Sequence, residues 1–176
     1  LRQLEVTRGQ VLLSTTGSLS VMQAVQLTSD TSNKLSLTAL DGNIDLRNDL
    51  SMGRGQMLLS AAKGDVLQSS NSDVINAGGA IDINALGLIQ SWGATLSSHA
   101  ASQAGNITVR VSGDVVVSAI NASTGVLDVQ STGGHIIEAL NAQGQGDAAA
   151  DARAGAAGGV LLRDRYHRLA FRHLQD

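Results

Sequence analysis

Three aspartates that each stand between two apolar residues are the best candidates for acid–base chemistry. Asp45, Asp82 and Asp128 hold this place in short repeated phrases. Polysaccharide lyases and hydrolases need carboxylates that converge on one groove, often with a basic residue. Asp45 belongs to a different series of phrases from the other two, which stand two repeats apart, roughly 9–10 Å at the spacing of stacked strands. We therefore expect no catalysis, and a β-helical polysaccharide-degrading enzyme is the alternative.

Calcium is the next chemistry to consider, because DGNIDLRND places Asp41, Asp45 and Asp49 at every fourth residue. Carboxylate oxygens are the ligands that Ca²⁺ prefers. Calcium-binding β-roll repeats carry Gly-Gly followed by Gly-x-Asp, and no Gly-Gly pair here continues in that way. We interpret these aspartates as solvated outward residues and predict neither a metal nor a cofactor. A calcium-stabilised surface repeat stays as an alternative.

The remaining reactive side chains are isolated in the sequence. A zinc site needs three or four ligands, whereas His99, His135, His167 and His173 show no such grouping, and the chain has no cysteine. The absence of cysteine excludes disulfides and cysteine-based metal or redox sites. Residues 127–129 read Leu-Asp-Val, a tripeptide that integrins recognise, but we interpret it as a chance match inside a strand.

The composition excludes several classes of protein. A net charge of -3 argues against a nucleic-acid partner, because such proteins carry a basic surface. No run of eighteen apolar residues occurs, so we expect no membrane-spanning segment. Aromatic residues reach only 2%, and proline is absent, while glycine occurs 20 times. Val, Ile, Leu and Ala must then fill a thin core. Because the chain begins within a repeat, we expect a fragment of a longer polypeptide.

A phrase of the form Gly-x-apolar-x-apolar recurs in two interleaved series. Successive members of the first series are 24, 22, 24, 26 and 20 residues apart, and its starting residues are Gly9, Asn33, Gly55, Gly79, Gly105 and Gly125. Members of the second are 25, 22, 23, 26 and 21 residues apart, and its starting residues are Gly17, Gly42, Gly64, Gly87, Gly113 and Gly134. The common period is therefore about 23 residues.

The residue two places after each start is apolar in every phrase, and the intervening residues are mostly polar. Alternation of this kind predicts a strand with one buried face. A third short apolar piece often follows each pair of phrases. Three strands per period predict an all-β fold, a right-handed parallel β-helix of about six coils that forms a rod segment roughly 25–30 Å long. A β-sandwich is the competing interpretation, although the chain lacks a regular series of hairpin turns.

The stretch AGGAIDINALGLIQSWGATL, residues 77–96, shows what this alignment implies for single residues. Ile81, Ile83 and Ile89 should point into the core, and Ser91 should be a defect in the inner column. Trp92 follows that defect and is the one large aromatic residue of the repeat region. It is the weak candidate for a binding contact if it faces outward, and it is only filler if it packs over Ser91.

The phrases AGGAIDINALGLIQS, GNITVRVSGDVVVSAINA and GVLDVQSTGGHI resemble the repeats of large bacterial surface exoproteins of the filamentous haemagglutinin type. The resemblance covers about residues 9–143. It implies a secreted rod or stalk on the bacterial cell surface that presents adhesive surfaces, exported by two-partner secretion or as an autotransporter-like passenger. The implied partners are an outer-membrane transporter and a receptor or glycan on a host or bacterial surface. The repeats of that family carry no catalytic residues.

The chain changes character after the repeats. Residues 1–143 form the predicted β-helix region, and residues 144–159 are rich in Ala and Gly, as in a flexible linker. Residues 160–176 contain several arginines and can be drawn as an amphipathic helix. This tail has three interpretations: a cap on the rod, a helix that binds a membrane or partner, or a disordered or non-native end.

Overall fold

The protein is an all-β parallel solenoid in the computed structural model, which confirms the predicted fold class. The structure describes residues 4–6, 9–27, 33–70, 72–98, 105–145, 152–153 and 160–163, and for the first and the last two of these stretches it describes only the backbone. None of these residues lies in a helix, so the described part of the chain contains no helix that could cross a membrane.

The described residues form twenty strands in three parallel sheets, in which each strand pairs with its equivalents in the neighbouring coils. Sheet A contains β1 (Leu4–Val6), β4 (Val25–Leu27), β7 (Leu50–Met52), β10 (Asp73–Asn76), β13 (Thr95–Ser97), β16 (Ala119–Asn121) and β19 (Ala152–Arg153). Sheet B contains the longer strands β2 (Gln10–Thr15), β5 (Lys34–Ala39), β8 (Gln56–Ala61), β11 (Ala80–Ala85), β14 (Ile107–Val111), β17 (Leu127–Ser131) and β20 (Val160–Arg163). Sheet C contains β3 (Leu19–Val21), β6 (Ile44–Leu46), β9 (Val66–Gln68), β12 (Leu88–Gln90), β15 (Val115–Val117) and β18 (Ile136–Glu138).

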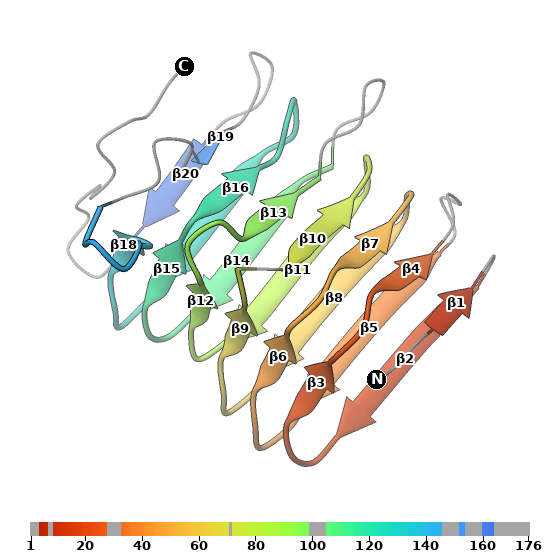
Figure 1. The fold of residues 1–176 in the computed structure, drawn as a ribbon. Helices are drawn as coiled ribbons and strands as arrows, with labels where there is room; N and C mark the ends of the chain where they lie inside the picture. The colour runs from red at the N-terminus through yellow and green to blue at the C-terminus, as the bar shows by residue number, and fades with distance from the viewer. Residues whose placement is uncertain are drawn as a thin grey trace.

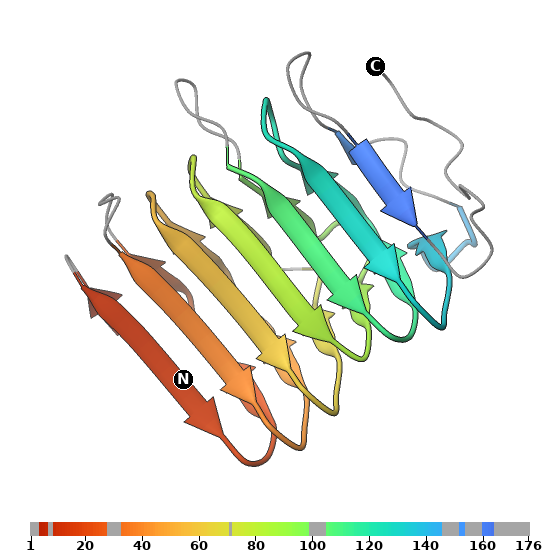
Figure 2. The ribbon, with the colours of Figure 1, turned by 180° about the vertical axis from the view of Figure 1, so that it is seen from behind.

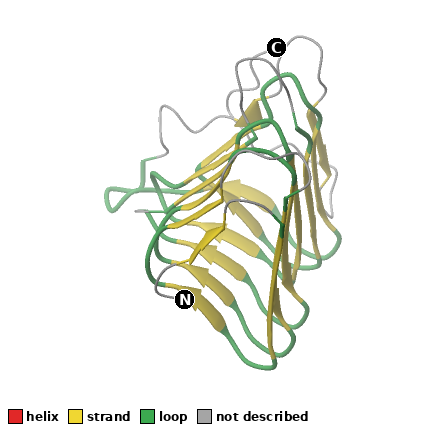
Figure 3. Cartoon of the chain, turned by 90° about the vertical axis from the view of Figure 1, so that its right-hand side faces the viewer, coloured by secondary structure: helices red, strands yellow, loops and turns green. Residues whose placement is uncertain are grey.

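The three sheets wind into a right-handed coil. In Figure 1 the chain rises through the short strands of sheets C and A in the foreground and descends through the long strands of sheet B behind them. It advances at the same time from the red N-terminal side at the right to the blue C-terminal side at the left. Figure 2 shows the long strands of sheet B from the opposite side, and Figure 3 shows the strands joined by loops around a narrow interior.

The alternating apolar residues of sheet B form the predicted inner column. The residues two places after each first-series start are all buried and stack in register, and they are Val11, Leu35, Met57, Ile81, Ile107 and Leu127. A single coil would leave this face in water. Stacking removes the face from solvent and stabilises the fold by about 25 cal/mol for each Å² of apolar surface that is buried. The repeat therefore produces a continuous core only when neighbouring coils are present.

One coil departs from the register that the glycine alignment predicts. Leu88 is fully buried, whereas Ile89 is only half-buried and points outward, so the prediction that Ile89 faces the core was wrong. Leu88 pairs with Val66, so Gly87 aligns with Asp65. Gly87 therefore lies one place past the corner that Gly64 occupies in the preceding coil. The connection before β12 is short, and that shifts the whole strand by one residue and exchanges its faces.

Two glutamines lie inside the core, and the shift of β12 accounts for the burial of Gln90. Gln68 and Gln90 are 2% and 1% exposed. The Nε2 of Gln68 donates to the carbonyl oxygens of Ser72 and Thr95 at 2.6 and 2.7 Å. The Nε2 of Gln90 donates to Oε1 of Gln68 at 2.9 Å, and Oε1 of Gln90 accepts the backbone N–H of Ser118 at 3.0 Å. The two side chains link three coils, so their burial leaves each amide satisfied. Ser91 lies in an exposed turn and is not the predicted core defect.

The first series of glycines marks a corner where consecutive coils touch through their backbones. A Cβ added at Gly79 would overlap the carbonyl of Gly55, one at Gly105 would overlap the carbonyl of Gly79, and one at Gly125 would overlap that of Gly105. Glycine is required at these three positions because no side chain fits between the coils there. The recurrence of glycine at the start of these phrases thus has a steric cause.

Polar side chains also tie one coil to the next at the corners. Asn76 donates from Nδ2 to the carbonyl of Gly55 in the preceding coil at 3.2 Å. Asn121 instead accepts the N–H of Ser123 within its own turn at 2.8 Å. At another corner, the N–H of Asp65 donates to Oδ1 of Asn43 at 2.9 Å, which repeats the same stacking principle.

The stack continues beyond the predicted end of the β-helix at residue 143. β19 pairs with β16, and β20 pairs with β17, both in parallel. Val160–Arg163 is therefore a strand, and a helix over 160–176 is wrong for these first four residues. Most of the predicted linker and residues 164–176 of the tail lie outside the described residues.

Candidate functional site

The three aspartates with catalytic potential do not converge. Asp45 lies on sheet C and forms an ion pair with Nε of Arg47 at 2.6 Å. Asp82 and Asp128 do share an outward column of sheet B, with Thr108 between them in register, as the repeat predicts. Their partners are different, however.

Each carboxylate of this outward column is already engaged by its own neighbour. Asp82 accepts a hydrogen bond from Nε2 of Gln56 at 3.3 Å. Asp128 forms an ion pair with the guanidinium of Arg110. These are structural contacts along the sheet, and they do not form a paired acid and base over a common groove.

The candidate calcium ligands are distributed around the coil. Asp41 pairs with Lys63 at 2.7 Å in the turns between sheets B and C, and Asp45 pairs with Arg47. Asp49, in the turn between sheets C and A, accepts the N–H of Asp73 at 2.9 Å. Within the described part of the chain, no three His, Cys, Asp or Glu residues form a group that could hold a metal ion.

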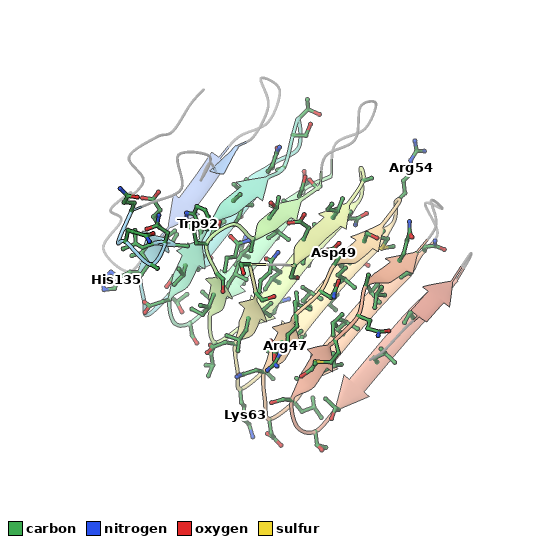
Figure 4. The ribbon with its side chains drawn as sticks, in the orientation of Figure 1. Arg47, Asp49, Arg54, Lys63, Trp92 and His135 are labelled. Carbon is green, nitrogen blue, oxygen red and sulfur yellow. The ribbon has the colours of Figure 1, made fainter. Side chains whose placement is uncertain are left out.

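His135 and the Leu-Asp-Val tripeptide are not arranged as a binding site in the structure. His135 lies in an exposed turn before β18 (Figure 4), and the other three histidines lie outside the described residues. Leu127 and Val129 are fully buried on β17, and Asp128 is held by Arg110. The tripeptide therefore lies within a strand, as predicted, and does not project from a turn.

Trp92 lies outside the core. It occupies the turn between β12 and β13, with 43% of its surface exposed. Figure 4 places it on the side of the stack formed by sheets C and A. Because Ser91 is in the same exposed turn, Trp92 does not fill a gap in the inner column. It remains a predicted contact residue.

An outward apolar column accompanies Trp92 on sheet C. Leu67, Ile89 and Val116 are half-buried and aligned in register, and Ile137 continues the column with 41% exposure. Outward positions of a strand are normally polar. The glycine alignment conceals this column, because it assigns Ile89 to the core.

A groove lies on the outer side of sheet B. It has a volume of about 450 Å³ and runs across four coils. One side is a column of polar residues in register, namely Ser60, Asn84, Arg110 and Gln130. The other lining residues are mostly small, namely Ala61, Ala62, Ala85, Val111, Ser112 and Thr132. Small turn residues such as Ala62 and Ser112 leave the hollow open.

Arg110 is held in place by hydrogen bonds, whereas its neighbours in the column have no hydrogen-bond partner among the described side chains. Its Nη1 donates to the carbonyl oxygens of Asp128 and Val109 at 3.0 and 3.1 Å, and its Nη2 pairs with the Asp128 carboxylate. The side chains of Ser60, Asn84 and Gln130 make no hydrogen bond within the described residues. The column thus combines a preorganised guanidinium with three polar groups that the described part of the chain leaves without a hydrogen bond, and these can accept or donate hydrogen bonds to a ligand.

The sequence carries the signal for this polar column, which lies on the outward face of the alternating pattern. The fifth residue after each first-series start is polar in every phrase, and these residues are Ser14, Thr38, Ser60, Asn84, Arg110 and Gln130. The sequence does not show the hollow beside the polar column, because the hollow depends on how each turn folds back toward sheet C. The basic residues Arg47, Arg54 and Lys63, in contrast, lie on separate parts of the stack (Figure 4).

Comparisons with protein-family models, with curated proteins and with solved structures found no match for this chain. The fold and the two outward columns show that the chain is a parallel β-helix with elongated lateral surfaces.

Proposed function

We propose that this chain is a structural and binding segment of a large secreted bacterial surface adhesin, without catalytic activity. In this role the β-helix is a rod or stalk that presents adhesive surfaces to a receptor or glycan on a host cell or another bacterium. An outer-membrane transporter exports the polypeptide to the cell surface, by two-partner secretion or as an autotransporter-like passenger.

The observation that carries this proposal is the in-register repetition of surface groups along the stack. The polar column of sheet B and the apolar column of sheet C each present one residue per coil over four coils. Contacts of this kind are individually weak, but they act together when one ligand spans several coils. A stiff stack whose core is continuous keeps their spacing fixed.

The export route is supported by the resemblance of the repeats and by the architecture. Each coil needs only its neighbour for burial and hydrogen bonding, so the fold can grow coil by coil from one end. A chain without cysteine does not depend on an oxidising compartment to fold.

Adhesion of intact cells tests the proposed function. Cells that produce the complete polypeptide should adhere to epithelial cells or to one another more than cells from which its gene has been deleted. Complementation with the gene should restore adhesion. Equal adhesion of both strains to epithelial cells and to one another would contradict an adhesive role.

A further inference from the structure

We infer that the groove beside Ser60, Asn84, Arg110 and Gln130 binds a linear, uncharged, β-1,4-linked polysaccharide that lies along the axis of the stack, with one sugar unit for each coil. The inference rests on the proposed function for its biological setting and names the class of ligand and its site. The binding itself depends only on the geometry and chemistry of the groove.

The spacing of the polar column favours a saccharide over a peptide. Adjacent strands of a sheet are about 4.8 Å apart, and this is the distance between successive residues of the column. One pyranose unit of an extended polysaccharide is close to that length, so successive sugars can meet successive coils. An extended peptide advances only about 3.3 Å per residue and would lose register within a few residues.

The backbone of the groove gives a second reason to exclude a peptide. Extended peptides commonly bind by adding a strand to a free sheet edge. β8, β11, β14 and β17, which carry the polar column, are each paired on both sides. Their backbone groups are therefore already used, and recognition must come from side chains.

The side chains of the groove fit a ligand rich in hydroxyl groups. The Ser60 hydroxyl and the amides of Asn84 and Gln130 can each donate and accept, as sugar hydroxyls do. The one charged group is Arg110, and its charge is offset by Asp128. A neutral ligand therefore meets no uncompensated charge, whereas an acidic ligand would compete with Asp128 for the same guanidinium.

The shape of the groove agrees with a flat, extended chain. The accessible residues beside the polar column are small, among them Ala62 and Ala85, so no bulky side chain divides the hollow between coils. The apolar faces of sugar rings can lie against the methyl groups of Ala62 and Ala85 while the hydroxyls face the polar column. Trp92 takes no part, because its turn joins sheets C and A whereas the groove lies on sheet B.

Titration calorimetry of the purified chain with cello-oligosaccharides of two to six sugars tests the inference. Affinity should rise with each sugar up to four units, because four coils line the groove, and should then level off. Cellohexaose should bind at least about tenfold more tightly than maltohexaose, whose α-1,4 linkages curve the chain away from the axis, a difference of about 1.4 kcal/mol. A second series made from fully N-acetylated chito-oligosaccharides, which are also uncharged, should show the same dependence on length.

Single substitutions locate the site. Asn84→Ala and Gln130→Ala should each lower the affinity for cellohexaose by roughly three- to tenfold, because each removes one or two hydrogen bonds to the ligand. Thr108→Ala is the matched control: it removes a hydroxyl from the neighbouring outward column of the same sheet and should leave the affinity unchanged. Equal melting temperatures of all three variants would show that the fold is intact.

Three results would overturn the inference. These are the absence of binding by both oligosaccharide series, an affinity that does not depend on length, and an affinity that Asn84→Ala and Gln130→Ala leave unchanged. A decapeptide that binds in the same groove more tightly than cellohexaose would also overturn it. If the cells adhere but the chain binds no oligosaccharide, the proposed function stands and only this inference fails. If the chain binds the oligosaccharides but plays no part in adhesion, this inference stands and the proposed function fails.

Discussion

At the scale of single residues, the stack depends on a few positions whose requirements are strict. Most inner positions accept any apolar side chain of similar volume, as the mixture of Val, Leu, Ile and Met in one column shows. The buried glutamines and the corner glycines are different. The glutamines need hydrogen-bond partners in three coils, and the glycines need to lack a side chain.

Replacement of Gln90 by Leu should destabilise the protein. The change leaves Oε1 of Gln68 and the N–H of Ser118 without the hydrogen bonds that Gln90 provides. Because both groups are buried with the core, we expect the free energy of unfolding to fall by about 1–3 kcal/mol. Urea denaturation measures this value. A Gln90→Leu variant as stable as the parent would show that the glutamine pair contributes nothing.

Replacement of Gly105 by Ala should be still more harmful. The added Cβ would overlap the carbonyl of Gly79 in the preceding coil, so the two coils would have to separate. We expect a loss of about 3 kcal/mol in the free energy of unfolding, the upper range for overpacking. Gly17→Ala is the control, because no atom lies within 4 Å of its added Cβ. Equal losses for the two variants in urea denaturation would contradict a steric role for the corner.

At the scale of strands and turns, the sequence predicts the sheet positions well where strand and turn lengths are regular. The apolar columns of β5, β8 and β14 follow directly from alternation, because one face is buried. The fourth coil breaks this regularity. A glycine marks a turn but does not fix its length, so Gly87 gave the wrong register for β12. The place of Ile89 in the outward apolar column and the burial of Gln90 depend on that register.

Substitutions in β12 distinguish the two registers directly. Leu88→Ala should lower the free energy of unfolding by about 2–5 kcal/mol, as is usual for a fully buried leucine. Ile89→Ala should cost less than about 1.5 kcal/mol, because its side chain is half-buried on the outer face. Thermal and urea denaturation of both variants provide the comparison. The reverse order would support the alignment based on glycine and contradict the structure.

At the scale of the whole molecule, the chain is a scaffold in which surface groups repeat with the coil. The candidate site could be predicted only in part. The polar column is present in the sequence, but the hollow beside it arises from small turn residues such as Ala62 and Ser112 that the alternation does not specify. Trp92 was identified from the sequence alone, and its exposure in a turn agrees with the outward position considered for it.

Chelation should leave the stability of the molecule unchanged. The aspartates that suggested calcium are each held by a protein group, as in the pair between Asp41 and Lys63. We therefore expect the melting temperature to be the same in excess EDTA as in millimolar calcium, by circular dichroism. A fall of several degrees in EDTA, reversed by added calcium, would establish the calcium-stabilised alternative.

The central claim is that this β-helix is displayed outside the cell, and antibody labelling of intact cells tests it most directly. An antibody raised against the purified chain should label unpermeabilised cells that produce the complete polypeptide, and external protease should remove the label. Cells without the gene are the control. Labelling that appears only after the envelope has been permeabilised would contradict the claim.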